Sequence, residues 1–142
     1  MRGATTIRRT TRLAWTLTLV ALCAAQSGCG DAAAQDIIEV RAADLPCADA
    51  APEADGSWQT APLPPLPTGC SWLPFTGRRT YVFDHPLGRT PRDVEVFVSF
   101  DQSGTPASLG AGDEALIEGA DASSFSLRNG TRQDFFVRVI LR

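Results

Sequence analysis

The sequence contains no lysine, and all thirteen of its basic residues are arginines. It contains a single histidine, His85, and no Gly-x-Ser-x-Gly motif, so no catalytic triad is indicated. It also lacks a glycine-rich phosphate-binding loop, an EF-hand spacing and a zinc-binding spacing of cysteine and histidine. These absences argue against an enzyme, a metal site and a bound cofactor.

The charge balance argues against a nucleic-acid partner. From residue 29 onward the chain carries nine arginines and sixteen acidic residues, which is a net charge of −7. A nucleic-acid-binding protein needs a basic face, whereas an acidic surface favours solubility. The length of 142 residues is typical of one domain, and a content of 44% apolar residues is sufficient for a folded core.

The first 35 residues have the layout of a secretory signal peptide. Four arginines come first, the apolar run 13–25 follows, and small residues come next. The run is too short to span a bilayer as a helix of the mature protein, which needs about 20 apolar residues. We therefore expect an exported protein.

The apolar run is followed by Gln26-Ser27-Gly28-Cys29, which resembles a bacterial lipobox. Ser27, Gly28 and Cys29 fit that motif, whereas Gln26 stands where an aliphatic residue is usual. The resemblance implies a bacterial lipoprotein, in which a diacylglycerol is attached to the Cys29 thiol and the chain is cleaved just before it. Two or more acyl chains are enough for stable attachment to a bilayer.

Two processing routes give two locations. Lipidation makes residues 1–28 the signal peptide and residues 29–35 the lipidated cysteine with its tether. The protein would then be held in the bacterial cell envelope, on the periplasmic face or at the cell surface. The alternative is cleavage after Ala34, at an Ala-x-Ala site, which would release a secreted protein. The sequence favours lipidation of Cys29 and leaves the second route open.

Cys47 and Cys70 bracket a proline-rich segment, residues 46–74, called here the cysteine loop. Proline lacks the backbone donor that a strand ladder needs, so this loop is predicted to form neither a helix nor a central strand. Exported proteins fold in an oxidising compartment, and these two cysteines remain once Cys29 is lipidated and the signal peptide is removed. We expect a Cys47–Cys70 disulfide, which closes about 24 residues and removes roughly 3 kcal/mol of denatured-state entropy.

Three aromatic residues form a candidate binding face. Trp58 and Trp72 lie in the cysteine loop, where they either cap the sheet or offer a large contact area with one polar group. Phe97 points away from the valines of its strand, so it is either covered by the cysteine loop or exposed to a partner. Both interpretations stay open at the level of sequence.

The second half of the chain has the alternation that is typical of β-strands. The clearest run places Val94, Val96, Val98 and Phe100 on one face with a period of two. The sequence predicts an all-β protein, a small antiparallel β-sandwich of about six strands, over the single domain 36–142. The expected strands occupy residues 36–41, 79–84, 92–101, 114–118, 123–128 and 134–142.

Two connections in this half carry turn signals. Asn129-Gly130 is a common hairpin signal, and pairing Leu127 with Phe135 around a longer or bulged turn gives an apolar face. We therefore predict that the last two strands form a hairpin. The connection 85–91 contains two prolines and a glycine, which predicts a long hairpin or an arch between sheets.

Three stretches of this half carry a family resemblance: Phe83-Asp-His-Pro-Leu-Gly-Arg-Thr-Pro91, the alternating Val94, Val96 and Val98, and Phe125-Ser-Leu-Arg128. With them, residues 79–142 resemble H-type lectin domains and related tips of phage tail fibres. The resemblance implies a six-stranded antiparallel sandwich that is often trimeric or hexameric, in a family of which many members bind glycans. Residues 134–142 lack the tryptophan that H-type lectins usually carry there, so no binding residue is transferred.

The sequence thus indicates a lipid-anchored cell-envelope protein that acts as a non-catalytic binding module. Its expected partners are the lipid bilayer, through Cys29, and a protein or a glycan of unknown identity. Two alternatives stay open. One is a structural envelope protein that forms a homo-oligomer through its sheet, and the other is a secreted, soluble, lectin-like protein.

Overall fold

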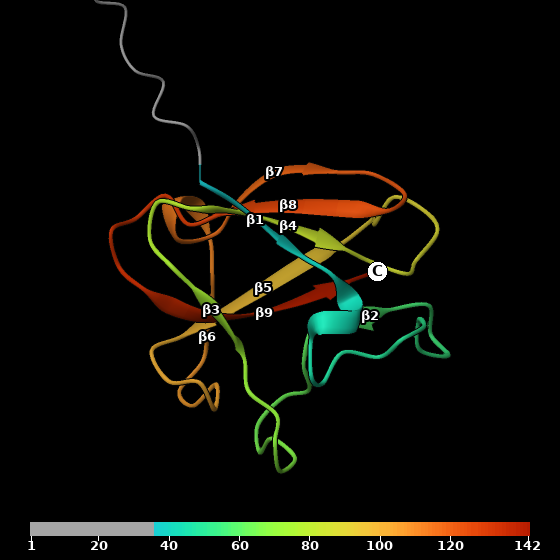
Figure 1. The fold of residues 1–142 in the computed structure, drawn as a ribbon, viewed down its shortest axis with the longest axis horizontal. Coiled ribbons are helices and arrows are strands. Elements are labelled where there is room, and N and C mark those ends of the chain that lie inside the picture. The colour runs from blue at the N-terminus through green and yellow to red at the C-terminus, as the bar shows by residue number, and fades with distance from the viewer. Residues whose placement is uncertain (1–35) are drawn as a thin grey trace, which may run out of the picture. The chain divides into compact units, whose positions relative to one another are not determined.

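Two β-sheets pack face to face in the computed structural model, which describes residues 36–142 (Figure 1). The predicted all-β sandwich is confirmed, with nine strands in the described part in place of about six. The strands are β1 (Ile37–Val40), β2 (Trp58–Gln59), β3 (Leu73–Phe75), β4 (Thr80–Asp84), β5 (Val94–Ser99), β6 (Ser108–Leu109), β7 (Leu116–Ala120), β8 (Ser124–Arg128) and β9 (Phe135–Leu141). Two short 3-10 helices, η1 (Ala42–Asp44) and η2 (Gly112–Glu114), lie between strands.

The order of the strands defines two open sheets. Sheet A has the order β1-β4-β8-β7, and sheet B has the order β2-β9-β5-β6, with β3 also paired to β9. β1 runs parallel to β4, and the other neighbouring strands are antiparallel. The outermost strands are therefore β1 and β7 in sheet A, and β6 on one side of sheet B.

The core lies between the two sheets because their inward faces carry the alternating apolar residues. Val96 and Val98 of β5 are buried, as the period of two predicts. Sheet A contributes mainly aromatic rings, and those of Phe83 and Phe125 have centroids 6.1 Å apart. The buried core residues are Val40, Leu45, Trp58, Phe75, Tyr81, Phe83, Val96, Val98, Ala115, Phe125, Leu127, Phe135, Val137, Val139 and Leu141.

The predicted hairpin at Asn129-Gly130 is wrong. β8 pairs with β4 and β7 in sheet A, whereas β9 pairs with β5 in sheet B. Leu127 and Phe135 do share an apolar environment, but they reach it from opposite sheets. The connection between them is an arch from one sheet to the other. The connection 85–91 likewise joins β4 of sheet A to β5 of sheet B, so the arch alternative holds there.

The cysteine loop is closed by the expected Cys47–Cys70 disulfide. It supplies two short strands, β2 and β3, which pair with opposite ends of β9. β3 has β9 as its one neighbouring strand, so Pro74 can lie in it without breaking a second ladder. The loop therefore extends sheet B along one edge and forms no central strand.

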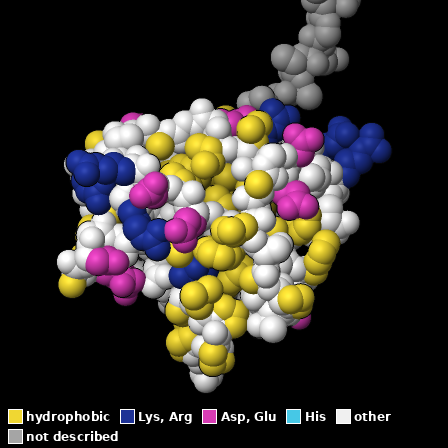
Figure 2. All heavy atoms as spheres, turned by 180° about the vertical axis from the view of Figure 1, so that it is seen from behind, with side chains coloured by type: hydrophobic (Ala, Val, Ile, Leu, Met, Phe, Trp, Pro, Cys, Tyr) yellow, Lys and Arg dark blue, Asp and Glu magenta, His cyan; other side chains and the backbone are white. Residues whose placement is uncertain are grey.

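Several large apolar side chains lie at the surface of the described part. Figure 2 shows one face on which hydrophobic side chains run down the middle and charged groups lie mainly toward the sides. Isolated exposed apolar residues are ordinary, but those that border a hollow are candidates for contact with a partner. The exposed large apolar residues are Ile37, Leu63, Phe100, Leu109, Leu116 and Ile117.

Candidate functional site

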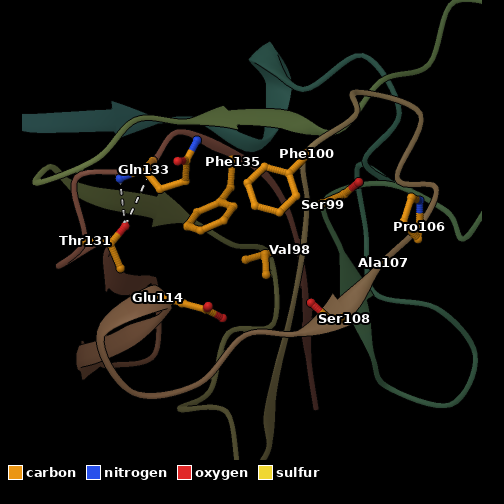
Figure 3. Close-up of a pocket in the computed structure, with 10 residues that line it drawn as sticks. All are labelled: Val98, Ser99, Phe100, Pro106, Ala107, Ser108, Glu114, Thr131, Gln133 and Phe135. Atoms are coloured by element: carbon orange, nitrogen blue, oxygen red, sulfur yellow. Dashed lines mark hydrogen bonds between the residues drawn. The ribbon is translucent and has the colours of Figure 1, made fainter.

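A pocket of about 420 Å³ opens at one end of the sandwich, where β5 ends at Ser99 and β9 begins at Phe135 (Figure 3). We call it the sandwich-end pocket. One part of its wall comes from residues 98–114, which include the end of β5, the loop to β6, β6 itself and η2. The other part comes from the arch between β8 and β9 and from the first residue of β9. The lining residues are Val98, Ser99, Phe100, Pro106, Ala107, Ser108, Glu114, Thr131, Gln133 and Phe135.

Two phenylalanines form the aromatic wall of this pocket. The ring centroids of Phe100 and Phe135 lie 5.2 Å apart. Phe135 is 7% exposed and belongs to the core, whereas Phe100 is 71% exposed. The sequence places Phe100 on the buried face of a strand, but β5 ends at Ser99 and Phe100 follows it at the open end of the sandwich. An aromatic side chain in this position offers one face of its ring to a ligand.

The pocket has one charged side chain, that of Glu114. In Figure 3 its carboxylate points toward the space between Val98 and Ser108. The four salt bridges within residues 36–142 do not include Glu114. The pocket therefore combines an apolar floor, hydroxyl groups and one carboxylate that has no arginine partner.

A buried asparagine shapes the arch that forms the far wall. Asn129 is fully buried, and its side-chain amide donates to the carbonyl oxygens of Phe75, at 3.0 Å, and Gln133, at 2.8 Å. Its side-chain oxygen accepts hydrogen bonds from the backbone N–H and the hydroxyl of Thr131. Asn129 thus uses both ends of its amide to position two residues that line the pocket.

The same arch holds the segment that carries Glu114. The backbone N–H of Gly130 donates to the carbonyl oxygen of Asp113 at 2.7 Å. This hydrogen bond joins the arch to η2, and Glu114 is the last residue of that helix. Asn129 and Gly130, which predicted a hairpin from the sequence, therefore position both the arch and η2, which line the pocket.

The predicted binding face of Trp58, Trp72 and Phe97 is wrong for both tryptophans. Trp58 is 0% exposed and Trp72 is 1% exposed. Trp58 belongs to the core between the sheets, and its indole N–H donates to the carbonyl oxygen of Asp49 at 2.9 Å. Removing a ring of this size from water is favourable, so packing against sheet B buries both tryptophans. The capping interpretation therefore holds for Trp58.

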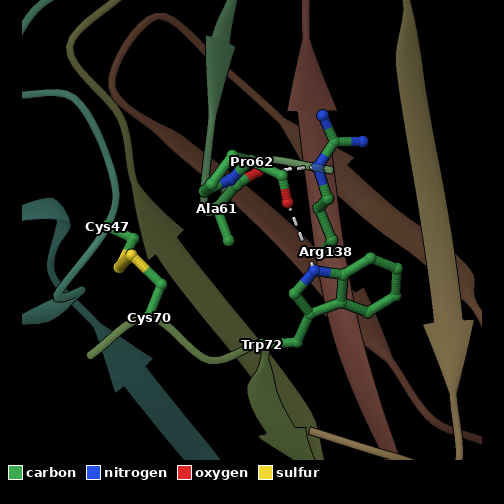
Figure 4. Close-up of a disulfide and its surroundings, with 6 residues drawn as sticks. All are labelled: Cys47, Ala61, Pro62, Cys70, Trp72 and Arg138. Carbon is green, nitrogen blue, oxygen red and sulfur yellow. Dashed lines mark hydrogen bonds between the residues drawn. A yellow bond between two sulfur atoms is a disulfide. The ribbon is translucent and has the colours of Figure 1, made fainter. Parts of the chain in front are cut away.

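Trp72 packs on the other side of sheet B, next to Arg138 (Figure 4). A Cβ atom added at Gly104 would overlap the Trp72 indole, so a glycine is needed there for the ring to fit. The backbone N–H of Trp72 donates to the carbonyl oxygen of Gln102 at 2.9 Å. Trp72 thus fixes the position of loop residues 102–104, which follow Phe100.

The side chain of Arg138 covers the Phe97 ring, so Phe97 does not present an open binding surface. The guanidinium of Arg138 lies 5.4 Å from the centre of the Phe97 ring. Arg138 is buried, which lowers its pKa, and its Nε–H donates to the carbonyl oxygen of Ala61 at 2.6 Å. The same guanidinium donates to the side-chain oxygen of Gln59. Arg138 therefore links Phe97 to the cysteine loop, and Phe97 keeps a half-buried position.

The remaining candidates lie elsewhere. His85 is 6% exposed and does not line the pocket, and neither of its ring nitrogens has a hydrogen-bond partner in the described part. Residues 36–142 contain no group of three or more histidine, cysteine or acidic side chains arranged to hold a metal ion. They also contain no helix that is long and apolar enough to cross a membrane. Cys29, the predicted site of lipidation, lies outside the described residues.

Comparison with known proteins adds no relative. No family model, no curated protein and no solved structure matches the chain. The resemblances to lipoproteins and to H-type lectins therefore stay predictions.

Proposed function

We propose that this chain is an exported, non-catalytic binding module that contacts its partner at the sandwich-end pocket. The observation that carries the proposal is Phe100, a large aromatic side chain that is 71% exposed beside the buried Phe135. Apolar area left in water is unfavourable, and an exposed aromatic ring at a hollow is a typical anchor for a partner. The proposed function thus rests on a pocket that the sequence analysis did not predict.

The proposal includes a lipid anchor on Cys29 in the bacterial cell envelope. Its support is the order of arginines, apolar run and lipobox-like residues 26–29 in the sequence. The intact mass of the mature protein tests this part independently. A chain that begins at Cys29 with added acyl mass supports the anchor, and an unmodified chain that begins near Gln35 supports the secreted alternative.

Site-specific photo-crosslinking tests the binding site in native envelopes. A photoreactive phenylalanine analogue at position 100 is expected to give a discrete adduct with one partner. The matched control is the same analogue at position 63, because Leu63 is 55% exposed and does not line the pocket. Equal labelling from positions 63 and 100 would contradict the proposal. A glycan array with the wild type and Phe100→Ala decides whether the partner is a glycan.

A second candidate function is assembly through the sheet. The observation in its favour is β7, an outermost strand in which all five residues are exposed, including Leu116 at 45% and Ile117 at 47%. Light scattering at low salt tests it. A stable oligomer that Ile117→Lys dissociates would favour the structural role over the binding module.

A further inference from the structure

An acidic stretch of the chain lies beside the pocket. The stretch from Phe100 to Asp121, called here the acidic segment, contains five acidic residues and no arginine. It also supplies Phe100, Pro106, Ala107, Ser108 and Glu114 to the pocket lining. Within the described residues, Glu118 is the one acid of this segment that forms a salt bridge, at 3.6 Å from Arg128. The segment therefore presents a net negative field to an approaching partner.

The pocket itself fits a cationic group on an apolar stem. Val98, Phe100 and Phe135 offer apolar surface along the pocket, and Glu114 places a carboxylate at its edge. Lysine and arginine side chains have this construction, with methylene groups that pack on apolar surface and a charged head. A cation over an aromatic ring gains further attraction from the ring quadrupole. Arg132 lies in the arch but does not line the pocket, so it leaves Glu114 as the one charge there.

An unpaired strand edge lies next to this pocket. β6 is the outermost strand on its side of sheet B within the described residues, and it pairs with β5 alone. Its first residue, Ser108, lines the pocket, and its second, Leu109, is 66% exposed. The backbone of such an edge can accept an added strand from another chain. If an extended segment of a partner paired with β6, every second side chain of that segment would face the pocket.

We propose that the sandwich-end pocket takes a lysine or arginine side chain from an extended segment of a partner protein. The stem lies against Phe100 and Phe135, and the charged head meets the Glu114 carboxylate. This inference rests on the proposed function and specifies the chemistry of the partner. A second copy of this chain is disfavoured as the partner, because its own acidic segment would meet the same field.

An NMR titration of the mature protein with three blocked pentapeptides tests the inference. The peptides have the order threonine, valine, variable residue, valine, threonine, and the variable residue is lysine, norleucine or glutamate. Norleucine keeps the stem of lysine and removes its charge. We expect the lysine peptide to bind about three- to ten-fold more tightly than the norleucine peptide, with resonances of the pocket shifting, and the glutamate peptide to bind most weakly.

Two variants assign the charge preference to one carboxylate. Glu114→Gln is expected to bring the ratio of lysine to norleucine affinity close to one while norleucine binding persists. Asp113→Asn is the matched control, because it removes a neighbouring charge that does not line the pocket and keeps the backbone hydrogen bond to Gly130. It is expected to retain most of the preference.

Three results would overturn the inference. They are no saturable shift with any peptide, a norleucine or glutamate peptide that binds as tightly as the lysine peptide, and a lysine preference that survives Glu114→Gln. Crosslinking from position 100 separates this failure from failure of the proposed function. If a discrete adduct still forms, the module binds at the pocket but its partner is not cationic there.

Discussion

The cysteine loop and the acidic segment differ in where they place their aromatic residues. The cysteine loop buries Trp58 and Trp72 completely, and it adds two short strands to β9. In the acidic segment Gly104 and Ala115 are the buried residues, and Phe100 stays 71% exposed. The loop therefore stabilises the sandwich, whereas the acidic segment leaves Phe100 and Glu114 exposed.

The contrast arises from the edges that each region covers. The cysteine loop lies against β9. Its strands β2 and β3 pair with the edge of β9, and its residues accept hydrogen bonds from the buried Arg138. The acidic segment forms the outermost strands β6 and β7, whose outer edges have no strand beside them in the described part. A region with few buried apolar contacts contributes little to stability and is suited to binding.

Removal of the core tryptophan is expected to give the largest loss of stability. Trp58→Ala should lower the free energy of unfolding by about 3–5 kcal/mol, because it empties a fully buried site in the core. Urea denaturation followed by circular dichroism measures the loss. Leu63→Ala in the same loop is the control, and it should change the free energy by less than about 0.5 kcal/mol. If both variants lost similar amounts of free energy, the cysteine loop would not stabilise the sandwich through its buried tryptophan.

The disulfide is expected to have the next largest effect. Replacing Cys47 and Cys70 together by serine should cost roughly 3 kcal/mol, since the closed loop restricts the denatured chain. Denaturation of the oxidised wild type and the double variant under identical conditions checks the value. If the two proteins unfolded at the same urea concentration, the loop would not be a stabilising element.

Asn129→Ala should cost about 1–3 kcal/mol, because the carbonyl oxygens of Phe75 and Gln133 lose the donor that the buried Asn129 side chain supplies. The variant should also shift the NMR resonances of Thr131 and Gln133 in the pocket. Asn129→Asp keeps an acceptor for Thr131 but removes the amide donor, so it separates the two roles. Unchanged pocket resonances in both variants would show that Asn129 does not position the arch.

A smaller effect concerns the end of the acidic segment. Hydrogen bonds from the backbone N–H groups of Ser123 and Ser124, and then from their hydroxyls, lower the pKa of Asp121 from 3.8 to about 2. Because the folded pKa is depressed, the stabilising contribution is complete above the unfolded pKa and is lost as the pH falls from about 4 through about 2. NMR titration of the carboxyl group measures the pKa, and Asp121→Asn should remove this part of the acid destabilisation. Titration at 3.8 would contradict the account.

The sequence predicted the strands more reliably than their partners. The alternation of Val96 and Val98 placed β5 correctly, because a period of two depends on local geometry alone. The hairpin at Asn129 failed because an apolar face is satisfied equally by pairing within one sheet and by facing a second sheet. The long-range bond from Asn129 to Phe75, which fixes the arch, leaves no local signal in the sequence.

The candidate site was missed in the sequence analysis for a related reason. Tryptophans in an irregular loop suggested a binding face, but burial depends on which edge the loop covers, and this is a tertiary property. Phe100 continues the alternation of β5, so the sequence places it in the core, and the end of the strand at Ser99 changes its environment. The five acids between Phe100 and Asp121, with no arginine among them, were the available signal for the proposed binding region.

The free energy of unfolding of Phe100→Ala tests the division between these two regions most directly. We predict a change of less than about 0.5 kcal/mol from the wild type, because the side chain is 71% exposed and its removal empties no core site. Such a result, beside the large loss in Trp58→Ala, would leave Phe100 free to serve a partner. A loss of about 2 kcal/mol or more would contradict the account, because Phe100 would then be part of the scaffold.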